Sequence, residues 1–187
     1  HRIGLDYDES EAMVYEFVGK VSEAGCKTFI VHARNAVLKG LSPKENRDIP
    51  PLRYTVVKRL KQDFPDLQFI LNGGITTIED IQSHLQWADG CMIGREAYSN
   101  PWLLAGFDEV IGKPTTHKTR LDVIEELRAY AERELAKGES IRNVTKSWLG
   151  LFHGQPGGRL YRQVLSDSTL LKANSWQVVE DALAKMA

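Results

Sequence analysis

The sequence predicts an α/β protein in which βα units build a parallel sheet, followed by a smaller helical part. In the first half of the chain, short apolar runs of strand length alternate with segments of helical periodicity. Each apolar run ends at polar residues or glycines. After Pro101 the apolar runs stop and only helical stripes follow. These three observations indicate repeated βα units with a helical appendage.

Residues 1–4, which precede the first predicted helix, resemble the end of a strand. Apolar residues at i, i+3, i+4 and i+7 predict an amphipathic helix over residues 10–24, which ends at Gly25. Residues 28–31 predict a short buried strand that ends at His32. Because the chain starts so abruptly, we expect it to be the C-terminal fragment of a longer protein.

A long segment, residues 33–51, separates this unit from the next. It contains Gly40, Pro43, Pro50 and Pro51, and it is too long and too often interrupted for a routine connection. Long loops in compact domains are usually functional. We therefore expect this loop to contribute to a site.

The pattern then repeats. Apolar residues predict a helix over residues 56–64 and a strand over residues 68–71, which closes on Asn72, Gly73 and Gly74.

A further unit begins at Thr76, which with Glu79 predicts a capping box and a helix to about residue 87. A strand over residues 91–93 follows and closes on Gly94 and Arg95. Carboxyl ends of parallel strands meet at one edge of the sheet. Four such ends are expected here: Arg2, His32, Asn72 and Gly94.

Gly112-Lys113-Pro114 predicts a boundary between residues 1–112 and residues 113–187. Beyond it, Trp148 and Phe152 lie four residues apart, a spacing typical of packing within a bundle, with stacking on bases as the alternative. A small bundle of about four helices is expected, over residues 121–135, 144–152, 159–165 and 178–186.

The formal net charge of -1 argues against indiscriminate binding to nucleic acid, but the charge is distributed unevenly. Residues 41–61 contain six basic against two acidic residues, and residues 140–172 contain five against one. Two basic segments therefore remain as candidates for contact with a polyanion.

No apolar run is long enough to span a membrane, and the N-terminal residues do not form a charged-then-apolar leader, so a cytoplasmic protein without membrane partners is expected. Cys26 and Cys91 lie in apolar stretches far apart in the sequence. They predict neither a disulfide framework nor a metal site.

Two consecutive strand ends have the composition of a phosphate site. Glycines at Gly73, Gly74 and Gly94 allow backbone N–H groups to approach a phosphate without interference from a Cβ atom. Arg95 would add the opposite charge and bidentate hydrogen bonds. The alternative is a pair of tight turns that bind no ligand.

Three further polar residues belong to the same predicted rim. His32 is expected to contact the ligand, although a histidine at the end of a strand is often a satisfied core residue. Arg2 and Arg34 are either ligand contacts or members of surface salt bridges.

Several segments together resemble a known family. HRIG, FIVHAR, GLSPKENRDIPPL, LNGGI, DGCMIGREAY and LGLFHGQPG are similar to the tRNA-dihydrouridine synthases, and within them to the subgroup that modifies positions 20 and 20a of the D-loop. The similarity extends over essentially the whole chain.

The resemblance implies the second half of a (β/α)8 barrel, that is, its last four βα units, followed by a helical domain that binds tRNA. It implies an FMN site and a substrate-orienting role for Arg2, which would face the uracil. The implied FMN contacts are His32, Asn72, Gly73, Gly74, Gly94 and Arg95.

In that family NADPH reduces FMN, a hydride passes to C6 of the uracil, and a cysteine donates a proton to C5. The family's cysteine lies in an earlier barrel loop, and neither Cys26 nor Cys91 matches it. The chain by itself is therefore expected to be inactive.

The basic segments suggest contacts with tRNA. Lys44 and Arg47 would hold phosphates or bases near the flipped uridine, and Arg159 with Arg162 would orient tRNA from the helical tail. The alternative for each is a solvated charged surface.

Two other functions remain open at this point: a flavin barrel that acts on a small pyrimidine, and an RNA-binding module without activity. The basic tail favours an RNA substrate over a small one. Half a barrel would expose sheet edges, so we also expect self-association.

Overall fold

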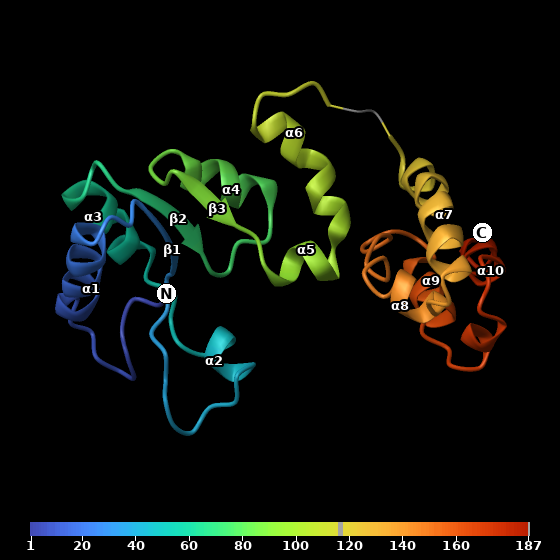
Figure 1. Cartoon of the computed structure of the whole chain (residues 1–187), viewed down its shortest axis with the longest axis horizontal. Helices are drawn as coiled ribbons and strands as arrows, with labels where there is room; N and C mark the ends of the chain where they lie inside the picture. The colour runs from blue at the N-terminus through green and yellow to red at the C-terminus, as the bar shows by residue number, and fades with distance from the viewer. Residues whose placement is uncertain (116–117, 187) are drawn as a thin grey trace. The chain divides into compact units, whose positions relative to one another are not determined.

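The computed structural model describes residues 1–115 and 118–186 and has two compact units, His1–Gly94 and Arg95–Ala187 (Figure 1). The sequence predicted a division after Gly112, but residues 95–112 group with the helices that follow them. The assignment of a barrel part and a tRNA-binding part to the two sides of Gly112 stays a prediction.

Three parallel strands form the sheet of the first unit, in the order β1 (Thr28–His32), β2 (Gln68–Asn72) and β3 (Gly90–Met92) (Figure 1). This confirms the α/β class with parallel strands, and the (β/α)8 closure stays a prediction. A fourth strand was predicted at the start of the chain, but Arg2 and Leu5 form only isolated parallel bridges with His32 and Ala36. The chain turns at Asp6, where φ is 48°, so few residues run beside β1.

The two faces of the sheet lie in different environments. On one face Phe29 and Phe69 are buried and stack with their ring centroids 5.7 Å apart. On the other face Ile30 and Met92 are 46% and 43% exposed. Successive side chains of a strand point to opposite faces of the sheet. The face with Phe29 and Phe69 is covered by helices, whereas the face with Ile30 and Met92 is open in this chain.

The helices of the first unit confirm the predicted periodicity. α1 (Ala12–Glu23) buries Val14 and Val18, α3 (Tyr54–Asp63) packs on β2, and α4 (Ile78–Leu85) packs on β3. The long segment after β1 contains only the short α2 (Glu45–Asp48). The predicted elements therefore occur in the predicted order.

The cap of α4 differs from its prediction by one residue. Thr77, and not Thr76, is the N-cap residue; its hydroxyl accepts the N–H of Asp80 at 3.0 Å. The carboxylate of Asp80 accepts the N–H of Thr77 at 3.2 Å and so completes the capping box that was assigned to Glu79. The extended backbone of Thr77 allows this geometry.

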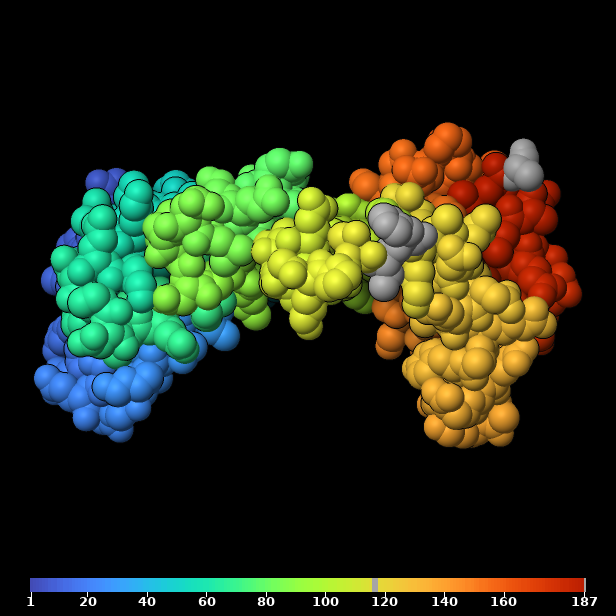
Figure 2. All heavy atoms as spheres, turned by 90° about the horizontal axis from the view of Figure 1, so that it is seen from above, coloured from blue at the N-terminus to red at the C-terminus, as the bar shows by residue number. Residues whose placement is uncertain are grey.

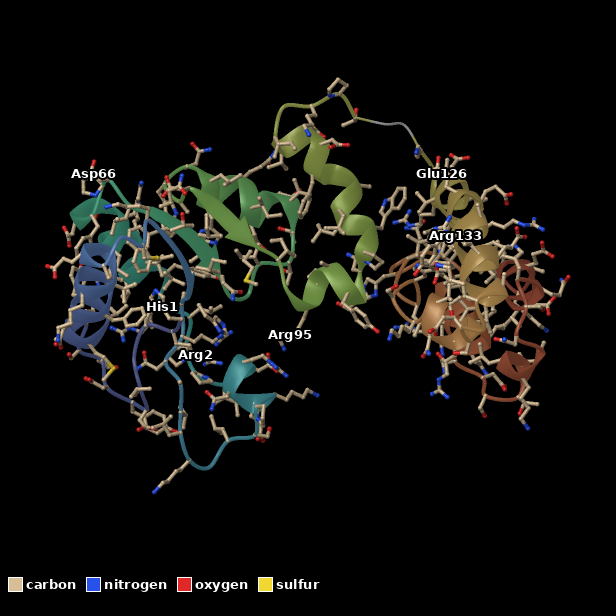
Figure 3. All side chains as sticks on the ribbon, viewed as in Figure 1. His1, Arg2, Asp66, Arg95, Glu126 and Arg133 are labelled. Atoms are coloured by element: carbon tan, nitrogen blue, oxygen red, sulfur yellow. The ribbon has the colours of Figure 1, made fainter. Side chains whose placement is uncertain are left out.

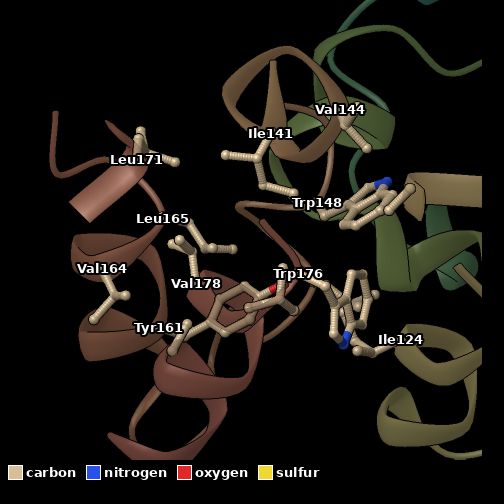
Figure 4. Packing of buried hydrophobic residues seen from close by; sticks show 14 of the residues in the cluster. Ile124, Ile141, Val144, Trp148, Tyr161, Val164, Leu165, Leu171, Trp176 and Val178 are labelled. Atoms are coloured by element: carbon tan, nitrogen blue, oxygen red, sulfur yellow. The ribbon is translucent and has the colours of Figure 1, made fainter. Parts of the chain in front are cut away.

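Helices make up the described part of the second unit, and their buried side chains share one core (Figure 4). Trp148 and Trp176 contact edge to face, and so do Phe152 and Tyr161. Trp148 and Phe152 are buried, which confirms that they pack in the core. The elements are α5 (Arg95–Ser99), η1 (Pro101–Gly106), α6 (Phe107–Val110), α7 (Arg120–Ala136), α8 (Ile141–Thr145), α9 (Gly158–Val164), η2 (Leu170–Ala173) and α10 (Gln177–Ala184).

The prediction of a helix over residues 144–152 is wrong. α8 begins earlier, because the hydroxyl of Ser140 accepts the N–H of Asn143, and it ends at Thr145. The chain then turns, and a Cβ atom on Gly150 would lie 1.9 Å from the carbonyl oxygen of Ser99. This close approach of two backbone segments takes the place of a continued helix.

α7 confirms the long helical stripe predicted over residues 121–135, and its residues form an outer surface of the second unit (Figure 2). Ile124 and Ala131 face the core. Exposed ion pairs such as Arg128 to Glu132, 2.9 Å apart, lie on its solvent side. Pairs of this kind contribute only about 0.3–0.5 kcal/mol each, so packing of the apolar stripe holds the helix.

Tyr161 provides a test of this core. Its side chain is fully buried, and in residues 1–115 and 118–186 its hydroxyl has no hydrogen-bond partner. Burial raises the pKa of the phenol. Tyr161→Phe should therefore raise the free energy of unfolding by about 1 kcal/mol. The difference in stability between the variant and the original protein should increase above pH 10.0, the ordinary pKa of tyrosine. There the phenol ionises in the unfolded chain but not in the folded one, which destabilises only the protein that has Tyr161.

Thermal and denaturant unfolding would measure the effect, with Thr145→Val as the matched control. Thr145 is also buried, but its hydroxyl donates to the carbonyl oxygen of Ile141 at 2.8 Å, so this variant should lose stability. A destabilised Tyr161→Phe variant would contradict the prediction.

Candidate functional site

The strand ends form a row of side chains across the first unit. His32 is paired in register with Asn72, and Asn72 with Met92, while the bridge to Arg2 extends the row on the other side of β1. The structure thus brings together the predicted residues Arg2, His32 and Asn72. Gly94 lies two positions beyond Met92, in a surrounding so open that an added Cβ atom would have no neighbour within 4 Å.

The glycine pair after β2 lies directly against His32. Gly73 and Gly74 have φ values of 119° and 69°. A Cβ atom on Gly73 would lie 2.7 Å from Cδ2 of His32, and one on Gly74 would lie 2.5 Å from Cδ1 of Leu52. The hydroxyl of Tyr54 donates to the carbonyl oxygen of Gly73 at 2.8 Å. These positions therefore need glycine both for backbone conformation and for space.

Arg2 is held by oxygens of the neighbouring loop. Its Nη1 donates to the carbonyl oxygens of Asn35 and Asn46, each at 2.7 Å, and to Oδ1 of Asn46 at 3.3 Å. Figure 3 shows its side chain close to α2. Burial, and then the nearby charges of Arg34 and Arg47, lower the pKa of Arg2. Three guanidinium groups therefore lie near one another at this rim.

Arg34, which was predicted at the rim, is buried and holds the long loop in place. Its Nη1 donates to the carbonyl oxygens of Asp48, at 3.1 Å, and Pro50. Asn35 is also buried and donates to the carbonyl oxygens of Asp6 and Asp8. Both residues fix the loop over the strand ends, a structural role.

A cavity of about 420 Å³ adjoins Arg2. This volume suits a small-molecule or nucleotide-sized ligand. Two guanidinium groups and several aliphatic side chains surround it, so it can accept a ligand that has both anionic or carbonyl groups and an apolar body. The lining residues are Arg2, Ala36, Val37, Leu38, Leu41, Pro43, Asn46 and Arg47.

The other predicted basic residues lie on the surface. Lys44 and Arg47 are exposed at α2, in the first unit. Arg159 and Arg162 are exposed on α9, and Arg95 is the exposed first residue of α5 (Figure 3). These last three belong to the second unit.

Neither cysteine lies at the rim. Cys26 precedes β1, and Cys91 pairs with Leu71 inside the sheet, where burial raises the pKa of its thiol. Both are free thiols. Residues 1–115 and 118–186 contain no group of three or more histidine, cysteine or acidic residues that could hold a metal ion. In the same residues, no helix is both long enough and apolar enough to span a membrane.

Sequence reasoning missed the residues that hold the rim together. Asn35, Asn46 and Tyr54 were not singled out. The sequence contained one indication that Asn46 has a role, namely its position in a long loop. Its partner Arg2 lies 44 positions away, so no local pattern links the two residues.

A parallel α/β fold with a polar, glycine-containing rim defines the class: an α/β protein whose strand carboxyl ends meet at one edge of the sheet, the edge at which proteins of this class place their ligand sites. Within that class, the chain belongs to the dihydrouridine synthase (Dus) family, which matches residues 1–187.

Curated relatives agree with this family. A tRNA-dihydrouridine(20/20a) synthase of Pseudomonas aeruginosa is 50% identical over 188 residues, which cover 100% of this chain and 57% of the relative. Proteins of the same name from Pseudomonas syringae pv. tomato and Pseudomonas putida are 52% and 47% identical, over 89% and 98% of this chain and 50% and 55% of their own lengths. The chain therefore spans about half the length of these relatives.

The contact between Gly73 and His32 can be tested by Gly73→Ala. The added methyl group would meet the imidazole and would also occupy an unfavourable φ. Gly40→Ala is a matched control, because Gly40 also has a positive φ, 87°, but an added Cβ atom there would have no neighbour within 4 Å. Gly73→Ala should lower the free energy of unfolding by about 1–3 kcal/mol more than Gly40→Ala. Equal losses in chemical denaturation would show that the close approach is unimportant.

Proposed function

We propose that this chain is part of a tRNA-dihydrouridine synthase, which reduces uridine to 5,6-dihydrouridine in the tRNA D-loop. Membership of the Dus family supports the reaction, and the names of the relatives support positions 20 and 20a. The observation on which the proposal chiefly depends is the row of Arg2, His32 and Asn72 beside the glycine pair.

The residues at the rim fit FMN. Within residues 1–115 and 118–186, the N–H groups of Gly73 and Gly74 donate no hydrogen bond, so they can donate to a phosphate. Asn72 and Gly94 lie beside them at the strand ends, and His32 offers an imidazole to the phosphate or to the ring. Arg95 would balance the phosphate charge. When bound, FMN supplies hydride transfer, with NADPH as the reductant.

Arg2 orients the substrate. Its Nη1 is engaged by the loop, so its remaining N–H groups can donate to the carbonyl oxygens of a uracil in the adjoining cavity. Cys26 precedes β1, and Cys91 pairs with Leu71 inside the sheet, so neither cysteine belongs to the row of strand-end residues. The proton donor therefore belongs to another part of the enzyme, and this chain alone is inactive.

The basic residues bind tRNA in this proposal. Lys44 and Arg47 lie on the loop beside the cavity and would hold phosphates next to the flipped uridine. Arg159 and Arg162 are three residues apart on α9, so they share one helical face that can follow an RNA backbone.

An RNA-binding module without activity is the second candidate for the isolated chain, because neither cysteine lies at the rim. The exposed Ile30 and Met92 on the open face of the sheet also support self-association when nothing covers that face.

An FMN titration tests the flavin site. The chain would be titrated alone and together with the part of the Pseudomonas aeruginosa relative that it does not cover, with flavin fluorescence as the readout. We expect tight binding only for the combined protein, and its loss in Arg95→Ala. Arg133→Ala, a change of an exposed arginine on α7, is the matched control and should bind normally. No binding in either form would favour the RNA-binding module.

Binding to unmodified tRNA tests the basic face of α9. Replacing Arg159 and Arg162 together by alanine should weaken binding and reduce the slope of log K against log salt by about 1 for each lost phosphate contact. The control replaces Arg133 of α7 and Lys137, the C-cap residue of that helix, both of which are exposed. An equal effect of both double variants would indicate only general electrostatic attraction.

A further inference from the structure

Asn46 joins α2 to the segment that follows β1. Its Oδ1 accepts the N–H of Val37 at 3.0 Å, and its Nδ2 donates to the carbonyl oxygen of Val37. The side-chain amide thus bonds to both polar groups of one backbone residue, as a neighbouring strand would. This double contact fixes the position of Asn46 in the long loop.

The same residue holds Arg2. Its carbonyl oxygen and its Oδ1 both accept from Nη1 of Arg2, at 2.7 Å and 3.3 Å, and the carbonyl oxygen of Asn35 accepts from the same nitrogen. The neighbouring charges of Arg34 and Arg47 repel Arg2, so this position depends on the oxygens that accept its hydrogen bonds. Asn46 provides two of those three oxygens.

This anchoring leaves one edge of the guanidinium available. In residues 1–115 and 118–186, Nε and Nη2 of Arg2 make no hydrogen bond, and Arg2 lines the cavity of about 420 Å³. Nε–H and Nη2–H form the side of the guanidinium that suits bidentate recognition of oxygen acceptors. Rotation about the side-chain bonds would misdirect this edge if Nη1 were released.

We propose that Asn46 is a positioning residue that presents the Nε and Nη2 edge of Arg2 to the carbonyl oxygens of the target uracil. The proposal rests on the proposed function and adds to it the loop residue through which Arg2 acts. Asn46 itself does not need to touch the substrate, because its contacts are with Arg2 and Val37.

A double-mutant cycle tests this role. The chain is joined to the part of the Pseudomonas aeruginosa relative that it does not cover, and dihydrouridine formation in unmodified tRNA is measured for Arg2→Ala, Asn46→Ala and the double variant. Asn46→Ala should lower kcat/KM about tenfold. The double variant should be no worse than Arg2→Ala, because Asn46 acts through Arg2. Asn143→Ala, which changes an exposed asparagine on α8, should retain full activity.

The outcomes separate the two proposals. An unimpaired Arg2→Ala variant would overturn the proposed role of Arg2 in the function. A loss in Arg2→Ala with none in Asn46→Ala would overturn the positioning role alone, and so would additive losses in the double variant.

A measurement on this chain alone provides an independent readout. With nitrogen-15 label, a guanidinium held through Nη1 rotates slowly and shows separate Nη1 and Nη2 signals for Arg2, assigned by their absence in Arg2→Lys. Asn46→Ala removes Oδ1 and both bonds to Val37, which hold the main chain of residue 46 in place, and should therefore merge these signals. Asn46→Asp retains the oxygen that accepts from Nη1 and should keep them separate. Unchanged signals in Asn46→Ala would overturn the proposal.

Discussion

Parallel pairing of β1 with β2 determines where every side chain of the rim lies. The register places His32 beside Asn72, and the bridge to Arg2 continues the row. A slip by one residue would move these side chains to the covered face of the sheet. Burial and stacking of Phe29 and Phe69 on that covered face oppose such a slip, because the slip would expose both rings. Packing of the covered face thus determines which side chains lie at the rim.

The rest of the rim depends on close contacts between the backbone and the side chains at the strand ends. Gly73 allows His32 to lie against the turn after β2, and the loop over the strand ends is tied down by Arg34 and Asn46. Arg2 is held by carbonyl and amide oxygens, which accept its hydrogen bonds without cancelling its charge. In the proposed function, this edge would receive a ligand with phosphate and carbonyl groups.

The second unit has a core of its own and presents its basic residues to solvent. Trp148, Phe152 and Tyr161 fill that core, so Trp148 and Phe152 are not available to stack on bases, whereas Arg159 and Arg162 are exposed. Packing thus forms the scaffold of the second unit, and charged side chains remain on its surface, as the proposed contacts with tRNA require.

Local spacing in the sequence was enough to place α1, α3, β1 and β2, and to identify His32 and Asn72 at strand ends. Helical and strand periodicities depend on residues a few positions apart, so a single sequence contains them. The start of α4 at Thr77 and the end of α8 at Thr145 were missed, because backbone contacts select among several local caps. The anchoring of Arg2 by Asn46 was decided only by the tertiary structure. It depends on how a long loop folds back over the sheet, and no local pattern specifies a contact between residues 44 positions apart.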